Sequence, residues 1–192
     1  MAKPLDHPLP QRLYHWVNLI SMAVLIITGF YINKPYTDGL MNGMRYLHFL
    51  AMFIIIANLT VRIYYAFVGK YKDAGDFAMR SKDWQNLLPT VKYYLFLGPH
   101  PDNGKYNPMQ KLMYLFYLPL LLLQGFTGLI MYRPELFDSL IKAMGGLASV
   151  RGYHYVLMWV FIAYIIVHVY MVLTEAWDEV KLMLFGIAEK EK

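Results

Sequence analysis

Residues 153–173 read YHYVLMWVFIAYIIVHVYMVL, an apolar run in which the imidazoles of His154 and His168 stand out. Crossing about 30 Å of hydrocarbon takes roughly 20 apolar residues in an α-helix. Three further stretches are long and apolar enough to do so, at residues 13–32, 46–68 and 109–132. We therefore predict an all-α integral membrane protein, a four-helix bundle that forms one domain over residues 1–192.

The composition supports a membrane protein and excludes several kinds of site. Of the 192 residues, 58% are hydrophobic and 16% are charged, well outside the averages of soluble domains. The first apolar stretch is too long for the core of a signal peptide and no small-residue cleavage site follows it, so we expect it in the mature protein. The absence of cysteine excludes disulfides, thiolate-held metal sites and covalent c-type haem attachment.

The distribution of Lys and Arg predicts the orientation. Four spans place both chain ends and residues 69–108 on one side, which carries 13 basic residues, and leave five on the other side. The positive-inside rule then puts both termini and the long connection in the cytoplasm. We expect a multi-pass protein of a bacterial or archaeal cytoplasmic (inner) membrane. The net charge of +5 then reflects topology and anionic lipid rather than nucleic acid.

The cytoplasmic connection, residues 69–108, contains an apolar stripe at helical spacing. Its members are Trp84, Leu87, Leu88 and Val91. Ser81 is a suitable N-cap for a helix here, whereas Pro89 interrupts the pattern. The segment therefore predicts one or two short interfacial helices along the membrane surface.

A short pattern occurs twice, near the outer ends of the two spans that run outward. It is Thr28-Gly29 in the first span and Thr127-Gly128 in the third. The repetition indicates either an internal repeat or small residues that let neighbouring helices pack closely.

Four histidines lie inside the predicted spans, where an ionisable side chain is costly and indicates a function. They are His15, His48, His154 and His168. The directions of the spans put His48 and His154 near the outer face, and His15 and His168 near the cytoplasmic face. His168 follows His154 by 14 residues, which corresponds to about 21 Å of helical rise and to nearly the same helix face.

Two imidazoles at one level are the axial ligands of a six-coordinate b-type haem, whose iron serves electron transfer. We predict an outer haem b with its iron held by His48 and His154, and an inner haem b with its iron held by His15 and His168. Two haems stacked in this way would carry electrons across the bilayer.

Hydrogen bonding between helices and zinc binding account for the four histidines less well than haem does. Any one of them alone is more readily explained as a hydrogen-bond partner, but the matched set of four favours haem. Zinc fits poorly, because no level gathers three histidines and no carboxylate lies near them within the spans. His7 and His100 fall in predicted cytoplasmic loops and are expected to face water.

Several segments along nearly the whole chain share a recognisable pattern. They are RLYHW at residues 12–16, TG at 28–29, RIYYAFVG at 62–69, YLFL at 94–97, YNP at 106–108, and His154 followed by HVYM at 168–171. This set resembles the di-haem cytochrome b subunits of membrane-bound Ni–Fe hydrogenases, with formate dehydrogenase gamma subunits as close relatives. The resemblance implies the same two pairs of haem ligands that the topology predicts.

The resemblance also implies a quinone site at the cytoplasmic side, next to the inner haem. In the formate dehydrogenase relatives an Asn of a Tyr-Asn-x-x-Gln-Lys segment contacts the quinone, and here Asn107 holds that position. The quinone would be menaquinone or ubiquinone. Met109 stands where those relatives carry a small residue. The alternative for Asn107 is structural, as the N-cap of the third span with Pro108 at its first position.

Two further polar residues have alternative roles. Arg62 either pairs with a propionate of the inner haem or extends to the lipid headgroups. Glu175 lies seven residues after His168 and either relays cytoplasmic protons to the reduced quinone or marks the end of the span. Three glycines are expected either to let a porphyrin lie flat against its helices or to ease helix packing. They are Gly29, Gly125 and Gly128.

We therefore expect an electron-transfer subunit that has no substrate chemistry of its own. A periplasmic Ni–Fe hydrogenase large subunit, or a formate dehydrogenase equivalent, would deliver electrons through an iron–sulfur small subunit to the outer haem, and the inner haem would reduce quinone. The alternative is a stand-alone di-haem cytochrome b acting as a superoxide:quinone oxidoreductase, although such proteins generally lack a connection as long as residues 69–108. A haem-free membrane anchor is a third possibility.

Overall fold

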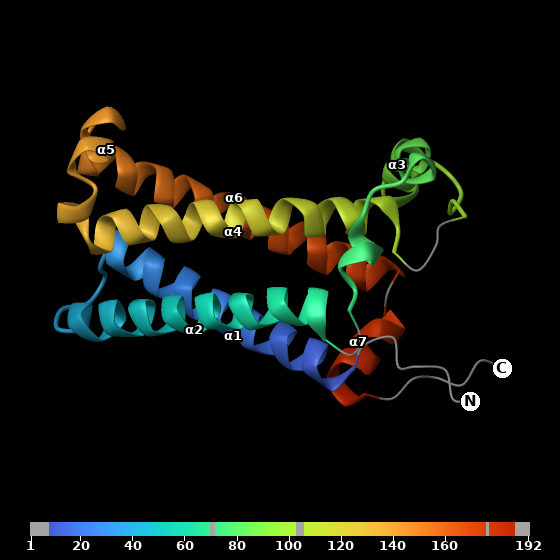
Figure 1. Cartoon of the computed structure of the whole chain (residues 1–192), viewed down its shortest axis with the longest axis horizontal. Helices are drawn as coiled ribbons and strands as arrows, with labels where there is room; N and C mark the ends of the chain where they lie inside the picture. The colour runs from blue at the N-terminus through green and yellow to red at the C-terminus, as the bar shows by residue number, and fades with distance from the viewer. Residues whose placement is uncertain (1–7, 70–71, 103–105, 176, 187–192) are drawn as a thin grey trace. The chain divides into compact units, whose positions relative to one another are not determined.

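A computed structural model of the protein describes residues 8–69, 72–102, 106–175 and 177–186, and within these ranges the chain is helical and has no strand (Figure 1). The α-helices are α1 (Leu9–Asn33), α2 (Met41–Val68), α3 (Ser81–Tyr94), α4 (Pro108–Tyr132), α5 (Asp138–Ala143), α6 (Leu147–Glu175) and α7 (Trp177–Phe185). Two short 3₁₀ helices, η1 (Ala74–Phe77) and η2 (Pro134–Leu136), precede α3 and α5.

Four of these helices, α1, α2, α4 and α6, are long and apolar enough to cross a membrane. They confirm the four predicted spans. The helices extend beyond the apolar runs, because a run measures the part suited to hydrocarbon and the helix continues into the polar interface. Gly145 and Gly146 set the start of α6. Their φ angles of 87° and 99° are not helical, so the helix begins just after them, at Leu147.

The chain forms two compact units, each built around one pair of long helices. The first unit comprises residues 1–72 and 177–192. In it α1 and α2 run in opposite directions and pack along their lengths (Figure 1). The buried residues of these two helices include Ser21 and Met22 of α1 and Ala51 of α2. The side-chain amide of Asn58 donates to the carbonyl oxygen of Tyr14 at 3.0 Å, which joins the two helices near the start of α1.

The C-terminal helix α7 belongs to the first unit and is capped by side chains of α1. Arg12 Nε and Trp16 Nε1 donate to the carbonyl oxygen of Met183 at 3.1 and 3.0 Å, and Arg12 Nη2 donates to the carbonyl oxygen of Leu184. These are carbonyl groups that the end of a helix leaves without intrahelical partners. Gly186 ends α7 with a φ of 71°, and a Cβ there would collide with the guanidinium of Arg12.

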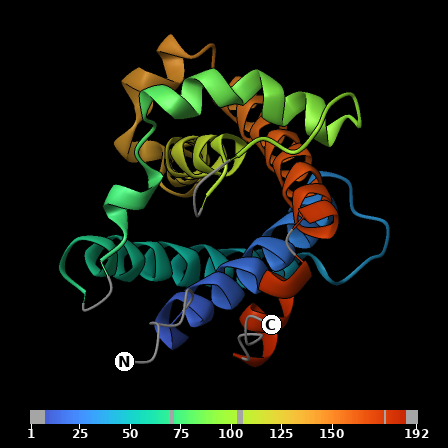
Figure 2. The ribbon, with the colours of Figure 1, turned by 90° about the vertical axis from the view of Figure 1, so that its right-hand side faces the viewer.

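The second unit, residues 73–176, contains the pair α4 and α6. Ile130 of α4 and Val150 and Phe161 of α6 are completely or almost completely buried. The ring of Tyr117 meets the edge of Phe161, with centroids 6.2 Å apart. Figure 2 shows that α3 runs across α4 rather than along it.

In the described part of the long connection, one α-helix, α3, forms after the short 3₁₀ helix η1, and two details of its prediction are wrong. Its N-cap is Arg80 rather than Ser81, because the Asp83 carboxylate accepts the backbone N–H of Arg80 at 2.8 Å. Pro89 does not interrupt the helix. The hydroxyl of Thr90 donates to the carbonyl oxygen of Asn86 at 2.7 Å and supports the turn that contains the proline.

An ion pair attaches α3 to the start of α4. Lys111 Nζ lies 2.8 Å from the Asp83 carboxylate, and the two side chains are 11% and 14% exposed. The hydrogen bond from Lys111 lowers the pKa of Asp83 below its ordinary value, and the backbone N–H of Arg80 acts in the same direction. Lys111 therefore has a partner inside the protein.

We predict that Asp83→Asn destabilises the attachment of α3. Removing one partner of a charged hydrogen bond lowers the free energy of unfolding by about 1.5–3 kcal/mol. Because the folded-state pKa of Asp83 is depressed, its contribution is present above the ordinary value of 3.8 and is lost as the pH falls through the lower folded-state pKa. The thermal unfolding temperature in detergent should therefore be lower for Asp83→Asn than for wild type at neutral pH. In acid the two unfolding temperatures should become equal. Asp102→Asn is the control, since Asp102 pairs with Lys82 on the exposed surface. Equal melting of wild type and Asp83→Asn at neutral pH would contradict the prediction.

Candidate haem site

In the first unit, a buried threonine of α1 holds a histidine of α2. The hydroxyl oxygen of Thr28 lies 2.8 Å from Nδ1 of His48. The same hydroxyl is 2.6 Å from the carbonyl oxygen of Val24 and 3.3 Å from that of Leu25, and Thr28 is 2% exposed. The ring of His48 is therefore fixed against α1 at the level of Thr28.

The second unit repeats this arrangement with different helices. The hydroxyl oxygen of Thr127 on α4 lies 2.8 Å from Nδ1 of His154 on α6. It is also 3.0 Å from the carbonyl oxygens of both Leu123 and Gln124, and Thr127 is 5% exposed. The repeated Thr-Gly pattern of the sequence thus has a structural meaning, because each threonine holds the imidazole of the neighbouring long helix.

The other nitrogen of His154 faces a glutamine. The amide nitrogen of Gln124 lies 3.1 Å from Nε2 of His154. The amide oxygen of Gln124 is buried and, within the described residues, has no hydrogen-bond partner. On the same side of α4, a Cβ on Gly128 would approach Cε1 of His154 to 3.3 Å. Gly128 therefore leaves room for the imidazole, whereas a Cβ on Gly125 would meet nothing within 4 Å.

The span histidines of each unit are separated by nearly the same rise. His15 precedes Thr28, the partner of His48, by 13 residues of α1, which corresponds to about 20 Å. His154 precedes His168 by 14 residues of α6, or about 21 Å. Each unit therefore carries one histidine at each of two levels. The predicted pairs join residues of different units, and the pairing stays a prediction.

The inner histidines have different surroundings. His15 is half-buried on α1, and its ring meets Trp16 edge to face with centroids 5.2 Å apart. Trp16 is in turn bonded to the end of α7. His168 lies on the exposed side of α6.

These residues fit a haem b. Imidazole nitrogens are the axial ligands of such haems, and an iron-bound histidine normally engages its second ring nitrogen in a hydrogen bond. His48 and His154 both have Nδ1 engaged, so Nε2 is the ring nitrogen that would bind a metal. The amide nitrogen of Gln124 lies 3.1 Å from Nε2 of His154, so the Gln124 side chain would have to turn aside for this nitrogen to bind iron.

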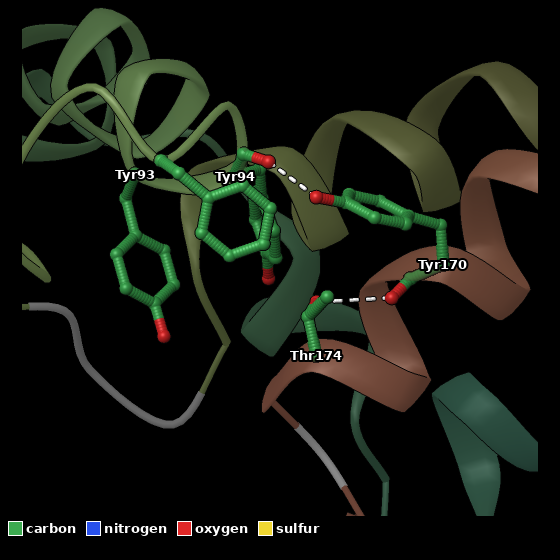
Figure 3. Close-up of a pocket in the computed structure, with 5 residues that line it drawn as sticks. Tyr93, Tyr94, Tyr170 and Thr174 are labelled. Atoms are coloured by element: carbon green, nitrogen blue, oxygen red, sulfur yellow. Dashed lines mark hydrogen bonds between the residues drawn. The ribbon is translucent and has the colours of Figure 1, made fainter.

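A pocket of about 200 Å³ lies between the end of α3 and the last turns of α6 (Figure 3). The residues that line it are Tyr93, Tyr94, Phe96, Tyr170 and Thr174. The hydroxyl of Tyr170 donates to the carbonyl oxygen of Tyr94, and the hydroxyl of Thr174 donates to the carbonyl oxygen of Tyr170 at 2.9 Å. Tyr170 follows His168 by two residues, so the pocket lies at the His168 end of α6.

Asn107 is the N-cap of α4, which confirms the structural alternative for this residue. Its Oδ1 accepts the backbone N–H of Gln110 at 2.9 Å, and the Gln110 side chain accepts the backbone N–H of Asn107 at 2.9 Å. The side-chain amide of Asn107 also donates to the hydroxyl of Tyr94 at 2.8 Å, and Asn107 is 3% exposed. Asn107 thus supports one wall of the pocket. Its contact with quinone stays a prediction.

The structure locates the remaining predicted residues, whose roles stay predictions. Arg62 is half-buried on α2. Glu175 is the last residue of α6, and its side chain lies outside the described part of the chain, as does the whole of His7. His100 is exposed as expected, and its ring also meets Tyr93 edge to face at 4.8 Å.

Sequence reasoning missed the polar partners of the site. Thr28 and Thr127 were visible as a repeated pattern, but their contacts with histidines depend on how the helices pack. Gln124 lies three residues before Thr127 and carries a polar group inside an apolar span, which was an available signal.

Four helices long and apolar enough to cross a membrane, with a histidine held by a buried threonine in each helix pair, fit a multi-pass membrane protein whose histidines could hold a cofactor. The sequence pattern of the family described as prokaryotic cytochrome b561 matches residues 6–186. The chain belongs to this family, and its class is that of membrane b-type cytochromes that transfer electrons.

Curated relatives confirm the resemblance to hydrogenase cytochromes. A protein of Azotobacter vinelandii described as a probable Ni/Fe-hydrogenase B-type cytochrome subunit is 30% identical, over 86% of this chain and 78% of its own. The corresponding protein of Cupriavidus necator is 29% identical over 86% and 77%. A probable Ni/Fe-hydrogenase 1 B-type cytochrome subunit of Escherichia coli K12 is 29% identical over 86% and 80%.

We predict that Gly128→Ala lowers the haem content of the purified protein. The added Cβ would lie 3.3 Å from Cε1 of His154 and displace the ring from Thr127 by a few tenths of an ångström. Gly152→Ala is the control, because Gly152 lies on α6 two residues before His154 and its Cβ would meet nothing within 4 Å. Haem per chain from the reduced pyridine haemochrome spectrum is the measurement. Equal haem content in the two variants would show that Gly128 has no such role.

Proposed function

We propose that this chain is the di-haem cytochrome b subunit of a Ni–Fe hydrogenase and passes electrons from that complex to membrane quinone. The names of the relatives support a hydrogenase large subunit and its iron–sulfur small subunit as partners. Formate dehydrogenase equivalents are the partners implied by the more distant resemblance.

The observation that carries the proposal is the matching depth of the histidines in the two units. The rise between the two histidine levels is about 20 Å in the first unit and about 21 Å in the second, as two haems at two depths of one bilayer would require. His48 and His154 then hold one haem b, and His15 and His168 hold the other. A chance arrangement of hydrogen-bonding histidines has no reason to match in this way.

Each haem, when bound, supplies a one-electron carrier. The imidazole nitrogens of the four span histidines would hold the iron of the two haems and would leave no ligand position for a substrate. Arg62 of α2 would pair with a propionate of the inner haem. The threonine-held imidazoles keep the outer ligands in one orientation.

The α3–α6 pocket supports a quinone site near the inner haem. Its lining is aromatic, as suits a quinone ring, and 200 Å³ is small for a ligand pocket, which fits a single ring whose tail remains in lipid. The hydroxyl oxygens of Tyr170 and Thr174 have given their protons to backbone carbonyls and can accept from a quinol. Glu175, one residue after Thr174, would relay cytoplasmic protons to the reduced quinone, and Asn107 would contact it or support Tyr94.

The orientation follows from the distribution of basic residues. Both termini and the long connection would lie in the cytoplasm, and the partner enzyme would dock outside the inner membrane. Electrons would then move inward, and proton uptake from the cytoplasm would make the reaction electrogenic. The exposed Trp84 and Leu88 of α3 support a position of this helix in the membrane interface.

We predict that His48→Ala and His15→Ala each remove one haem, and that the two lost haems differ. Each variant leaves a porphyrin with a single axial imidazole, which weakens its binding. Redox titration of the reduced b-type absorption in purified protein should show two components in wild type and a different single component in each variant. His100→Ala, which removes an exposed imidazole outside the spans, should retain both. Loss of the same component in both histidine variants would rule out the proposed pairs.

We predict that Thr174→Trp slows haem oxidation by quinone. The indole would fill the pocket beside Tyr170 while leaving the four span histidines in place. Stopped-flow oxidation of the dithionite-reduced protein by a short-chain quinone should slow at least tenfold, with unchanged haem content. Thr60→Trp is the control, since Thr60 forms the same bond to its own helix and is exposed on α2. An unchanged rate in Thr174→Trp would place the quinone elsewhere.

Co-purification separates the proposal from its rivals. A large metal enzyme and an iron–sulfur protein should accompany the affinity-tagged chain from its native membrane. Isolation of the chain alone, with haem reduction by superoxide, would favour a superoxide:quinone oxidoreductase. Full activity after replacement of all four span histidines would favour a haem-free anchor.

A further inference from the structure

We propose that Thr28 and Thr127 are positioning residues that fix the tautomer and the ring plane of the two outer-haem ligands. The inference rests on the proposed function, in that His48 and His154 are taken to hold one haem. It goes further in assigning a redox role to two buried hydroxyl groups, one in each unit.

A threonine hydroxyl has a single proton to donate. In the first unit Thr28 lies 2.6 Å from the carbonyl oxygen of Val24, one helical turn earlier. This carbonyl can only accept, so the hydroxyl proton goes to it. The lone pairs of the Thr28 oxygen then face Nδ1 of His48 at 2.8 Å, and Nδ1 must carry the proton of that bond.

The second unit has the same arrangement of protons. Two carbonyl oxygens, those of Leu123 and Gln124, each lie 3.0 Å from the hydroxyl of Thr127 and share its proton. Nδ1 of His154 therefore donates to the threonine oxygen at 2.8 Å. The amide nitrogen of Gln124, which can only donate, points to Nε2 of the same ring at 3.1 Å and requires the same tautomer.

Both threonines thus leave the lone pair on Nε2, the nitrogen that can bind iron. Threonines in helices commonly bond to their own backbone, and Thr60 does so with the carbonyl oxygen of Ile56 at 2.9 Å. Thr60 is exposed on α2. Thr28 and Thr127 differ from it in being buried and in holding an imidazole Nδ1 at 2.8 Å.

Two consequences follow for the outer haem. A hydrogen bond from Nδ1–H raises the basicity of the imidazole, which stabilises ferric over ferrous iron and lowers the reduction potential. The bond also restrains rotation of the ring, which sets the angle between the two ligand planes. Loss of either hydroxyl should therefore raise the potential of the outer haem and leave the inner haem unchanged.

The test uses the full chain with its haems and compares Thr28→Val and Thr127→Val with wild type. Valine keeps the shape of threonine and removes the hydroxyl. We expect a higher midpoint potential for one of the two haems, a shift of its low-spin electron paramagnetic resonance signal, and transfer of that haem to apomyoglobin about 10–100-fold faster. Thr28→Ser and Thr127→Ser, which keep the hydroxyl, should restore all three properties.

Thr60→Val is the matched control and should change none of them. Thr28→Ala and Thr127→Ala remove the same hydroxyl with a smaller side chain and replace any valine variant that does not accumulate. Unchanged potentials and resonance signals in the hydroxyl-free variants would overturn the inference, as would serine variants that behave like valine. His48→Ala distinguishes failure of the proposed haem ligands from failure of the proposed positioning role of the threonines. If it retains both haems, the proposed ligand set fails, whereas loss of one haem together with silent threonine variants refutes the positioning role alone.

Discussion

A polar group inside a bilayer has no water to bond with, and the hydroxyl–imidazole contacts of the two helix pairs follow from this constraint. A histidine placed in a span must find a hydrogen-bond partner in the protein. A threonine on the neighbouring helix can be that partner, because its hydroxyl proton goes to its own backbone and its oxygen is left to accept from the imidazole. Thr28 provides such a partner for His48, and Thr127 provides one for His154. The nitrogen that the threonine contacts is Nδ1 in both cases, and Nε2 is the nitrogen that would bind a metal.

The polar residues at the other ends of the long helices have a related explanation. Arg12 and Trp16 complete the last turn of α7, and Asn107 completes the first turn of α4 while holding Tyr94. Helix ends expose carbonyl or amide groups that need partners in a poorly hydrated interface. These caps adjoin His15 on α1 and the pocket of α6, so the local structure of the ends also fixes the surroundings of the proposed inner site.

The sequence predicted features that depend on one helix and missed those that depend on two. The spans followed from hydrocarbon thickness, and the levels of His154 and His168 followed from the rise of a helix. Ser81 was the predicted N-cap of α3 because hydroxyl residues usually cap helices. The N-cap is instead Arg80, whose backbone N–H donates to the Asp83 carboxylate. The interruption expected at Pro89 did not occur. The capping of α7 was beyond prediction, since Arg12 and Met183 are brought together by tertiary packing across nearly the whole chain.

A ligand that is oriented before the cofactor arrives loses its freedom on folding rather than on binding. The rings of His48 and His154 are each fixed within their own helix pair, by a threonine of that pair. Haem binding then needs little further ordering of these two side chains, which favours affinity for the cofactor.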